Sequence, residues 1–294
     1  MTARDLALAL VIVAIWGVNF AIIAIGLRDV SPLGLGVARF VLAALPWVFF
    51  IPRPAIPVRL LATYSLFIFV LQFAFLFTGM KVGMSAGLSS LILQLQVFFT
   101  IGLAVFVLGE KPTGWQLAGA LLAFCGIGVV AAHAGGDVTL AGLGLLILGA
   151  ASWGAGNIAA RQIAVRAPGT NTLALVVWGC LFAIPPHVLI ALVIDPHGLV
   201  SSVEHVSWAS AGAIAYIVYL STLFGFAVWS RLLGAYPVAT VAPFTLLVPV
   251  FGFLGSYLLL GEPIQGWKLA ASALVIAGLC VNLFGGRLAR RGTA

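Results

Sequence analysis

Long apolar runs, separated by short polar connections, cover almost the whole chain. Runs of about 20 apolar residues are typical of helices that cross a membrane. Periodicity within the runs is weak, because residues that face the core and residues that face lipid are both apolar. The longest connection, Asp195 to Ser207, is too short for a soluble domain. The pattern predicts ten transmembrane helices, over residues 5–27, 32–51, 59–79, 84–107, 113–133, 140–163, 171–194, 208–232, 238–260 and 265–286.

A short turn sequence occurs twice, at residues 108–117 and 260–269. Both copies contain Leu-Gly-Glu, then Pro, then Gly-Trp, and the matching Gly, Glu and Trp residues are 152 positions apart. Glycine ends a helix without a Cβ penalty, and proline suits the first turn of the next helix. We expect Glu110 and Glu262 to face the positive end of that next helix. A hairpin repeated this closely indicates two related halves of the chain.

A second pair of motifs indicates how the halves are related. Residues 15–19 read Ile-Trp-Gly-Val-Asn, and residues 152–157 read Ser-Trp-Gly-Ala-Gly-Asn. With five predicted helices in each half, the second half enters the membrane from the opposite side. Inverted repeats are common in transporters, whose substrate sites lie near the midplane between the repeats. The predicted fold is an all-α polytopic membrane protein, with ten transmembrane helices as two inverted five-helix repeats, 1–134 and 135–294, around a central cavity.

The composition excludes an ordinary soluble protein. The chain is 63% hydrophobic and 7% charged, whereas soluble domains carry about 25% charged residues. The net charge of +7 comes without a basic stripe interleaved with aromatic residues, so we expect no nucleic-acid partner. The three cysteines lie inside apolar runs without metal-ligand spacing, and the sequence predicts no metal site and no cofactor.

Lysine and arginine concentrate on one side of the predicted topology. Because cytoplasmic loops carry the excess of these residues, we expect both termini in the cytoplasm. Arg4 is followed by no small-residue cleavage site, so the first helix is expected to be retained. The segments predicted to be outside hold only Arg28, Lys81 and Lys268. Those predicted to be inside hold Arg4, Arg53, Arg59, Lys111, Arg161, Arg166, Arg231, Arg287, Arg290 and Arg291.

The two five-helix halves, the Trp-Gly-x-Asn motif and the Leu-Gly-Glu hairpins resemble the EamA branch of the drug/metabolite transporter superfamily. Residues 249–251 read Pro-Val-Phe, which is similar to a family motif, whereas the first half has Gln-Val-Phe at 96–98 in the corresponding stretch. Within the family, the chain is most similar to bacterial YddG-type amino-acid exporters. The resemblance implies a basket of helices 1, 3, 4, 6, 8 and 9 around a central cavity. It also implies export of neutral and aromatic amino acids, or similar small metabolites, across a bacterial inner membrane.

The expected partners are therefore a small-molecule substrate and the lipid bilayer. The sequence leaves the oligomeric state open, and a monomer is compatible with it. We expect alternating access, in which the helices of one half rock against those of the other around the cavity.

Polar side chains inside the predicted spans are candidates for the cavity wall, because they are costly in hydrocarbon and tend to face the bundle interior. In each half a Trp and an Asn share one helix face, Trp16 with Asn19 and Trp153 with Asn157. An indole beside a carboxamide suits a zwitterion with a carbon side chain. The structural alternative is that Asn bonds a neighbouring helix and Trp fills the bundle. The other predicted substrate-binding residues are Gln72, Ser90, Gln94, Tyr216, Tyr219 and Thr245.

Six further residues are predicted to act in gating or to be structural. Arg39 lies about seven residues inside the outer end of its helix, and we expect it to extend outward and meet Asp29. The alternative is a cation that binds a carboxylate or acts as a gate. His187 is interpreted as a structural histidine rather than a proton carrier. The remaining four are the hairpin carboxylates Glu110 and Glu262, and two prolines that kink the ninth helix or free its carbonyls, Pro243 and Pro249.

Two other functions stay open at this stage. A carrier for drugs or cationic compounds would need a carboxylate in the cavity, and no Asp or Glu lies centrally in a predicted span. The other is a non-transporting scaffold or an intramembrane enzyme. Residues 83–87 read Gly-Met-Ser-Ala-Gly and fit the nucleophile-elbow pattern, but that motif needs a strand-to-helix turn. We therefore expect no enzyme.

Overall fold

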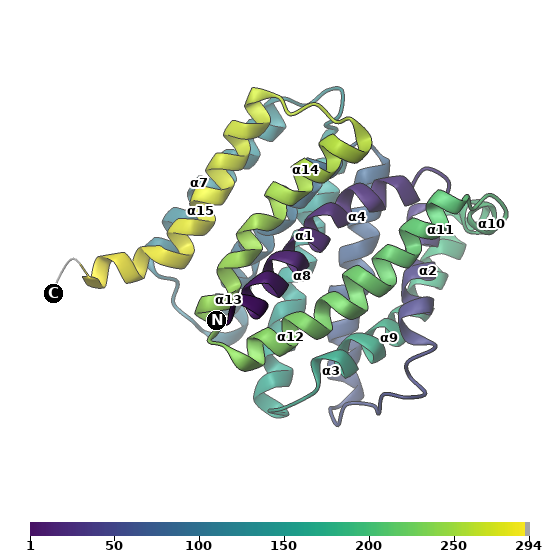
Figure 1. Ribbon diagram of the computed structural model, residues 1–294, viewed down its shortest axis with the longest axis horizontal. Coiled ribbons are helices and arrows are strands. Elements are labelled where there is room, and N and C mark those ends of the chain that lie inside the picture. The colour runs from purple at the N-terminus through teal and green to yellow at the C-terminus, as the bar shows by residue number, and fades with distance from the viewer. Residues whose placement is uncertain (292–294) are drawn as a thin grey trace.

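The chain forms long helices that pack side by side along most of their length (Figure 1). The computed structural model describes the backbone of residues 1–291 and the side chains up to residue 286, except those of residues 238 and 239. Arg287, Arg290 and Arg291, which were counted for the orientation, therefore lie outside the described side chains. Every named element within the described residues is a helix.

Nine helices in the described part of the chain are long and apolar enough to cross a membrane. Five are single helices, namely α1 (Ala3–Gly26), α7 (Gly114–Ala132), α8 (Leu140–Arg166), α9 (Thr172–Ile194) and α15 (Gly266–Arg291). Four are composite, and each has an irregular segment (η) in its course. These are α3 (Val58–Ser65), η1 (Leu66–Leu71) and α4 (Gln72–Lys81); α5 (Ala86–Ile92), η2 (Leu93–Leu95) and α6 (Gln96–Leu108); α11 (Trp208–Ala215), η3 (Tyr216–Phe224) and α12 (Gly225–Ala235); and α13 (Val238–Val241), η4 (Ala242–Leu247) and α14 (Val248–Leu260).

The predicted second span is shorter than the sequence pattern indicates. Helix α2 covers Pro32–Ala44, and turns follow where the prediction continued the helix to residue 51. Its 13 residues span about 20 Å, against about 30 Å of hydrocarbon. Pro46 lacks the N–H that a continuing helix would need. The apolar run was therefore correct, but its continuous helical extent was wrong.

The long connection before α11 also contains a helix that the sequence analysis missed. Helix α10 (Pro196–Glu204) begins where the Asp195 carboxylate accepts a hydrogen bond from Gly198 N–H at 2.9 Å. Ser202 on α10 accepts a bond from Ser31 N–H, also at 2.9 Å. This short helix thus covers the start of α2.

Two glycine crossings connect the first helix of each predicted half to the fourth helix of the other. A Cβ on Gly17 of α1 would lie 2.6 Å from the Val248 carbonyl oxygen of α14, and it would also meet Phe251. A Cβ on Gly154 of α8 would lie 2.8 Å from Phe99 Cβ of α6. Because Phe99 takes the place of Phe251, the expected match of 96–98 with 249–251 is one residue out of register. Figure 1 also shows α7 and α15 side by side along one edge of the bundle.

Candidate functional site

Four spans lose regular α-helical geometry in their course. Irregular backbone at membrane depth is tolerated where it is buried in protein or lines a cavity, and π-helical segments are frequent at functional sites. The interrupted spans are the predicted cavity-lining helices 3, 4, 8 and 9. The segments η1 and η3 are π-helical, whereas η2 and η4 are 3₁₀-helical. The candidate site is therefore the region in which these segments meet α1 and α8.

Two side chains predicted for the site connect α1 to the π-helical segment η3. Trp16 Nε1 donates a hydrogen bond to the Ser221 carbonyl oxygen at 2.9 Å. In the opposite direction, the Tyr216 hydroxyl donates to the Ile15 carbonyl oxygen at 3.0 Å. The Trp16 ring centroid also lies 5.2 Å from that of Trp229. Both predicted residues therefore hold η3 against α1 in this structure.

A third bond connects the two 3₁₀-helical segments. Gln94 Nε2 donates to the Thr245 carbonyl oxygen at 3.0 Å, so η2 is tied to η4. The hydroxyl of Thr245 bonds Ala242 O at 2.7 Å, and that of Ser90 bonds Gly87 O at 2.6 Å. The structure thus brings together two residues that were predicted separately as substrate-binding, Gln94 and Thr245, while both hydroxyls satisfy carbonyls of their own helices.

Asn157 lines an open, amide-containing cavity of about 420 Å³ between α6, α7, α8 and α15. Its Nδ2 donates to Gln96 Oε1 at 2.6 Å and to Thr100 Oγ1 at 3.0 Å. The cavity wall is rich in carboxamides and holds no charged side chain; it consists of Gln96, Val97, Thr100, Ile101, Gln116, Asn157, Asn282 and Leu283. Such a surface can hydrogen-bond a polar solute without imposing a charge on it.

Asn19 and Gln72 carry buried oxygen atoms that no other group satisfies. Asn19 Oδ1 and Gln72 Oε1 have no hydrogen-bond partner among the described residues. A buried unsatisfied carbonyl is costly unless a ligand or water completes it. Trp153, by contrast, is half-buried and packs against the apolar core. Tyr219 is 46% exposed, so the structure does not bring it to the bonded group around Tyr216.

The expected contact of Arg39 with Asp29 is wrong. Arg39 is only 3% exposed, and its Nη2 donates to Thr222 Oγ1 at 2.9 Å. Asp29 instead accepts bonds from the hydroxyls of Ser207 and Ser210 at 2.5 and 2.7 Å, which lower its carboxyl pKa. Arg39 therefore turns into the bundle, where its guanidinium bonds Thr222 and lies over the ring of Phe73.

His187 is buried, and neither of its ring nitrogens has a hydrogen-bond partner among the described residues, whereas the two predicted prolines lie at changes of helical geometry. The His187 ring is fully buried, with its centroid 4.9 Å from that of Phe40. Pro243 lies in the first turn of η4, and Pro249 lies in the first turn of α14. Because η4 continues into α14 without a break, Pro249 leaves the Thr245 carbonyl oxygen, four residues back, without an α-helical donor, and Gln94 Nε2 donates to that oxygen. These prolines thus begin new helical segments where the span changes its geometry.

The two hairpin carboxylates have different partners from the ones expected. Gly109 and Gly261 end their helices in the left-handed conformation, with φ of 68° and 69°. Neither Glu faces the helix that follows it. Glu262 accepts bonds from the N–H groups of Ala86 and Gly87 at 2.8 and 3.3 Å, and so caps α5. Glu110 pairs with Arg161 at 2.5 Å, and this bond lowers the pKa of its carboxyl group.

The prolines of the hairpins also lie outside the first helical turn. The α7 helix begins at Gly114, where the Thr113 side chain and Gln116 form a reciprocal capping box. Helix α15 begins at Gly266. Pro112 and Pro263 therefore precede the caps, in the connecting turns.

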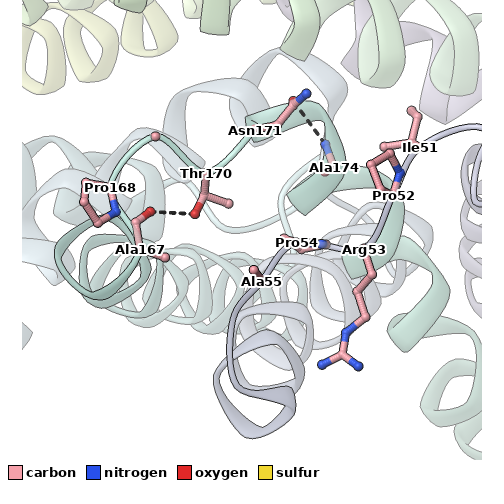
Figure 2. Close-up of a pocket in the computed structure, with 11 residues that line it drawn as sticks. Ile51, Pro52, Arg53, Pro54, Ala55, Ala167, Pro168, Thr170, Asn171 and Ala174 are labelled. Carbon is pink, nitrogen blue, oxygen red and sulfur yellow. Dashed lines mark hydrogen bonds between the residues drawn. The ribbon is translucent and has the colours of Figure 1, made fainter.

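A second cavity, more enclosed than the amide-rich one, lies between the connection at 51–55 and the one at 167–171 (Figure 2). Its volume is about 330 Å³, and it contains none of the predicted substrate residues. The polar groups drawn there serve their own turns: Thr170 Oγ1 donates to Ala167 O at 2.6 Å, and Asn171 Oδ1 accepts from Ala174 N–H at 3.3 Å. We therefore place the candidate site at the amide-rich cavity and the irregular segments.

Sequence reasoning missed Thr100 and two carboxamide residues of the amide-rich cavity, Gln116 and Asn282. Both carboxamides lie near the ends of their helices, where polar residues are ordinarily explained by the membrane surface. Their shared carboxamide chemistry with Gln96 and Asn157 is the signal that could have identified them, but only with the helix packing known.

Comparison with known proteins decides the family. The model of the EamA-like transporter family matches residues 4–132 and again residues 140–284. This chain belongs to the EamA-like transporter family. The EamA-like chain is 40% identical, over 99% of its length and 98% of the relative, to a protein of Salmonella typhimurium named probable amino-acid metabolite efflux pump. A protein of Escherichia coli with the same name is 39% identical over 97% of this chain and 96% of the relative.

More distant relatives agree with this assignment. A probable terminal-alkyne amino-acid exporter of Streptantibioticus cattleyicolor is 29% identical over 68% of this chain and 64% of the relative. A solved crystal structure superposes with a TM-score of 0.61 over 96% of this chain and 98% of that one, at 17% identity, which shows the fold alone. Membership of the family confirms that this EamA-like chain is a multi-pass membrane transporter and not an enzyme.

Proposed function

We propose that this EamA-like transporter exports amino acids and similar small metabolites across a bacterial inner membrane. The observation that carries the proposal is full-length identity of 40% and 39% to two proteins named as probable amino-acid metabolite efflux pumps. The amide-rich cavity supports a neutral polar substrate, because its wall offers donors and acceptors without a net charge. Neutral and aromatic amino acids fit such a wall.

The proposed architecture consists of two inverted repeats, residues 1–134 and 135–294, with both termini in the cytoplasm. The two separate matches of the family model support this division. Further support comes from features that recur in both halves: the hairpin with a left-handed glycine, the glycine crossing, and one π-helical and one 3₁₀-helical interruption. The excess of Lys and Arg on the Glu110 side supports the orientation.

The proposed mechanism is alternating access between the two ends of the fourth span. Helix α5 begins this span and α6 ends it, so the Glu262 and Glu110 hairpins lie at its opposite ends. At the Glu262 end, the carboxylate caps α5, and α5 packs tightly on α14. At the Glu110 end, the carboxylate is 46% exposed and is held by Arg161 instead. We assign the Glu262 end to the outside, so this arrangement corresponds to a state that is closed outward.

Transport by purified protein in liposomes tests the proposal. Vesicles loaded with labelled phenylalanine or leucine are expected to release the label faster than protein-free vesicles. Asn157→Ala is expected to slow this release, because it removes the bonds to Gln96 and Thr100 in the cavity. Thr170→Ala, in the second cavity (Figure 2), serves as the matched control and should leave the rate unchanged. No release above empty vesicles for a broad set of neutral amino acids would reject the proposed substrate class.

A further inference from the structure

Arg39 is a buried cation that forms few bonds of its own. Its Nη2 donates to Thr222 Oγ1 at 2.9 Å, and its guanidinium carbon lies 3.8 Å from the centroid of the Phe73 ring. Nε and Nη1 are buried and have no hydrogen-bond partner within the described residues. Guanidinium presents its donors as a planar fork that matches the two oxygens of a carboxylate. Nε–H points towards Nη2 and away from Nη1, so the two unpartnered nitrogens face separate acceptors, and Phe73 covers their common plane from one side.

Among the described residues, no carboxylate side chain bonds this arginine. The sequence contains seven acidic residues, and each has another place. Glu204 is the last residue of α10, and its side chain is exposed. Asp195 caps α10, Glu262 caps α5, and Asp29 is bound by two serines. The other three are in ion pairs, Asp5 with Arg231, Glu110 with Arg161 and Asp137 with Lys268.

Unsatisfied acceptors lie on α4, which packs against the helix of Arg39, and on α1, which is linked to that helix through η3. Helix α2, which carries Arg39, packs against α4 and η3, and α1 packs against η3 as well. Gln72 begins α4 and Asn19 lies on α1, and both have a buried side-chain oxygen without a partner. An amino-acid zwitterion needs donors for its carboxylate and acceptors for its ammonium group. The unused donors of Arg39 and the unused acceptors of Asn19 and Gln72 are complementary to those two needs.

We propose that Arg39 binds the carboxylate of the transported amino acid through Nη1, while the amide oxygens of Asn19 and Gln72 receive its ammonium group. This inference rests on the proposed function, and it adds a binding site on α1, α2 and α4 that is separate from the amide-rich cavity between α6, α7, α8 and α15. Thr222, the residue that holds Arg39, belongs to the π-helical segment η3. A change of helical geometry in η3 would therefore move the guanidinium directly. Substrate binding and movement of the eighth span are coupled through this one bond.

The test compares a carboxylate with its uncharged derivative on purified protein. Binding is measured as the ligand-induced shift of the thermal unfolding midpoint, with L-phenylalanine and L-phenylalaninamide as probes. Wild-type protein is expected to bind phenylalanine more tightly than the amide. Arg39→Gln should weaken phenylalanine binding at least about tenfold, because charge-assisted bonds are lost, and should leave binding of the amide unchanged. Arg39→Lys should be intermediate, and Arg59→Gln, an exposed arginine at the start of α3, should match wild type.

A purely structural arginine predicts a different result. In that case Arg39→Gln would weaken both probes equally and lower the unfolding midpoint of the ligand-free protein, and this would overturn the proposal. If Arg39→Gln does not fold, Thr222→Val provides the second variant, with the same expected loss for phenylalanine alone. If wild-type protein binds phenylalanine but does not carry it in liposomes, the proposed function fails while the Arg39 site stands. If wild-type protein shows no preference for the carboxylate, the Arg39 site fails.

Discussion

The two Leu-Gly-Glu hairpins have the same local structure and different tertiary partners. In both, the glycine is left-handed and its N–H bonds four residues back, while the Glu N–H bonds six residues back, Glu110 to Ala104 and Glu262 to Ser256, each at 3.3 Å. Yet the Glu262 carboxylate caps a helix of the other half, and the Glu110 carboxylate pairs with a partly exposed arginine. Local sequence determines the turn, whereas the partner of the carboxylate depends on which helix end lies nearby.

The repeat suggests what the Glu110 hairpin would bind in the opposite state. Moving the contacts of Glu262 along the chain by the repeat offset of 152 positions replaces Ala86 and Gly87 by Val238 and Ala239, the first residues of α13. We expect Glu110 to cap this helix start when the Glu262 hairpin is released.

An added methyl group should destabilise the packing at the Glu262 end far more than the packing at the Glu110 end. A Cβ on Gly252 of α14 would lie 2.6 Å from Ser90 Cβ of α5, whereas a Cβ on Gly102 of α6 would meet nothing within 4 Å. Gly252→Ala and Gly102→Ala gain the same helix propensity. The first is therefore expected to be less stable than the second by about 1–3 kcal/mol, the usual cost of overpacking. Equal unfolding free energies in denaturant would show that α5 and α14 are not in close contact.

Glu262→Ala should loosen the closed end. Loss of a helix cap costs about 1 kcal/mol, so the unfolding midpoint is expected to fall. In a background without the three native cysteines, Ser90→Cys should then react faster with a water-soluble thiol reagent. The reaction at Ser90→Cys should stay slow in the matched Glu110→Ala variant. The reverse order of reactivity would contradict the assignment of the closed end.

Glu110→Ala should reduce stability less than Glu262→Ala. The Arg161 and Glu110 side chains are 53% and 46% exposed, so water and salt screen their attraction. Thermal unfolding of the two alanine variants in the same detergent measures the difference. If the unfolding midpoint fell as far in Glu110→Ala as in Glu262→Ala, the two carboxylates would contribute equally to the stability of this state.

The contribution of Glu110 should also depend on pH. The hydrogen bond from Arg161 holds the pKa of Glu110 below its ordinary value of 4.5. A depressed folded-state pKa means that the bond stabilises the protein above the ordinary pKa and stops doing so as the pH falls through the folded-state value. The small difference in unfolding midpoint between wild type and Glu110→Gln is therefore expected at neutral pH and should vanish in strong acid. A difference that grows on acidification would have the wrong sign.

The long spans could be predicted from the sequence, because apolar runs of this length have few alternatives in a membrane. The limits of α1, α7 and α9 differ from the expectation by no more than two residues. The end of α2 at Ala44, just before Pro46, was not predicted, because an apolar run does not show where a helix stops within it. The π-helical segments carry no sequence signal of their own, and they arise from packing against neighbouring spans.

Sites that depend on distant partners were the least predictable. Glu262 was expected to face the N-terminus of the helix that follows it. Instead, it caps a helix that begins 176 positions earlier, at Ala86. Arg39 was expected to reach a nearby carboxylate, and it binds a threonine 183 positions away. In both cases the local alternative was plausible from spacing alone. Only the packing of the two halves decides between a near partner and a distant one.

The central claim is that the two ends of the transporter open in turn, and paired distance measurements test it most directly. Spin labels at Val82 and Ile264 report on the Glu262 end, and labels at Lys111 and Leu233 report on the Glu110 end; all four side chains are exposed. As substrate or mutation shifts the population, the first distance is expected to lengthen while the second shortens. Two distances that stay fixed, or that lengthen together, would contradict alternating access in this protein.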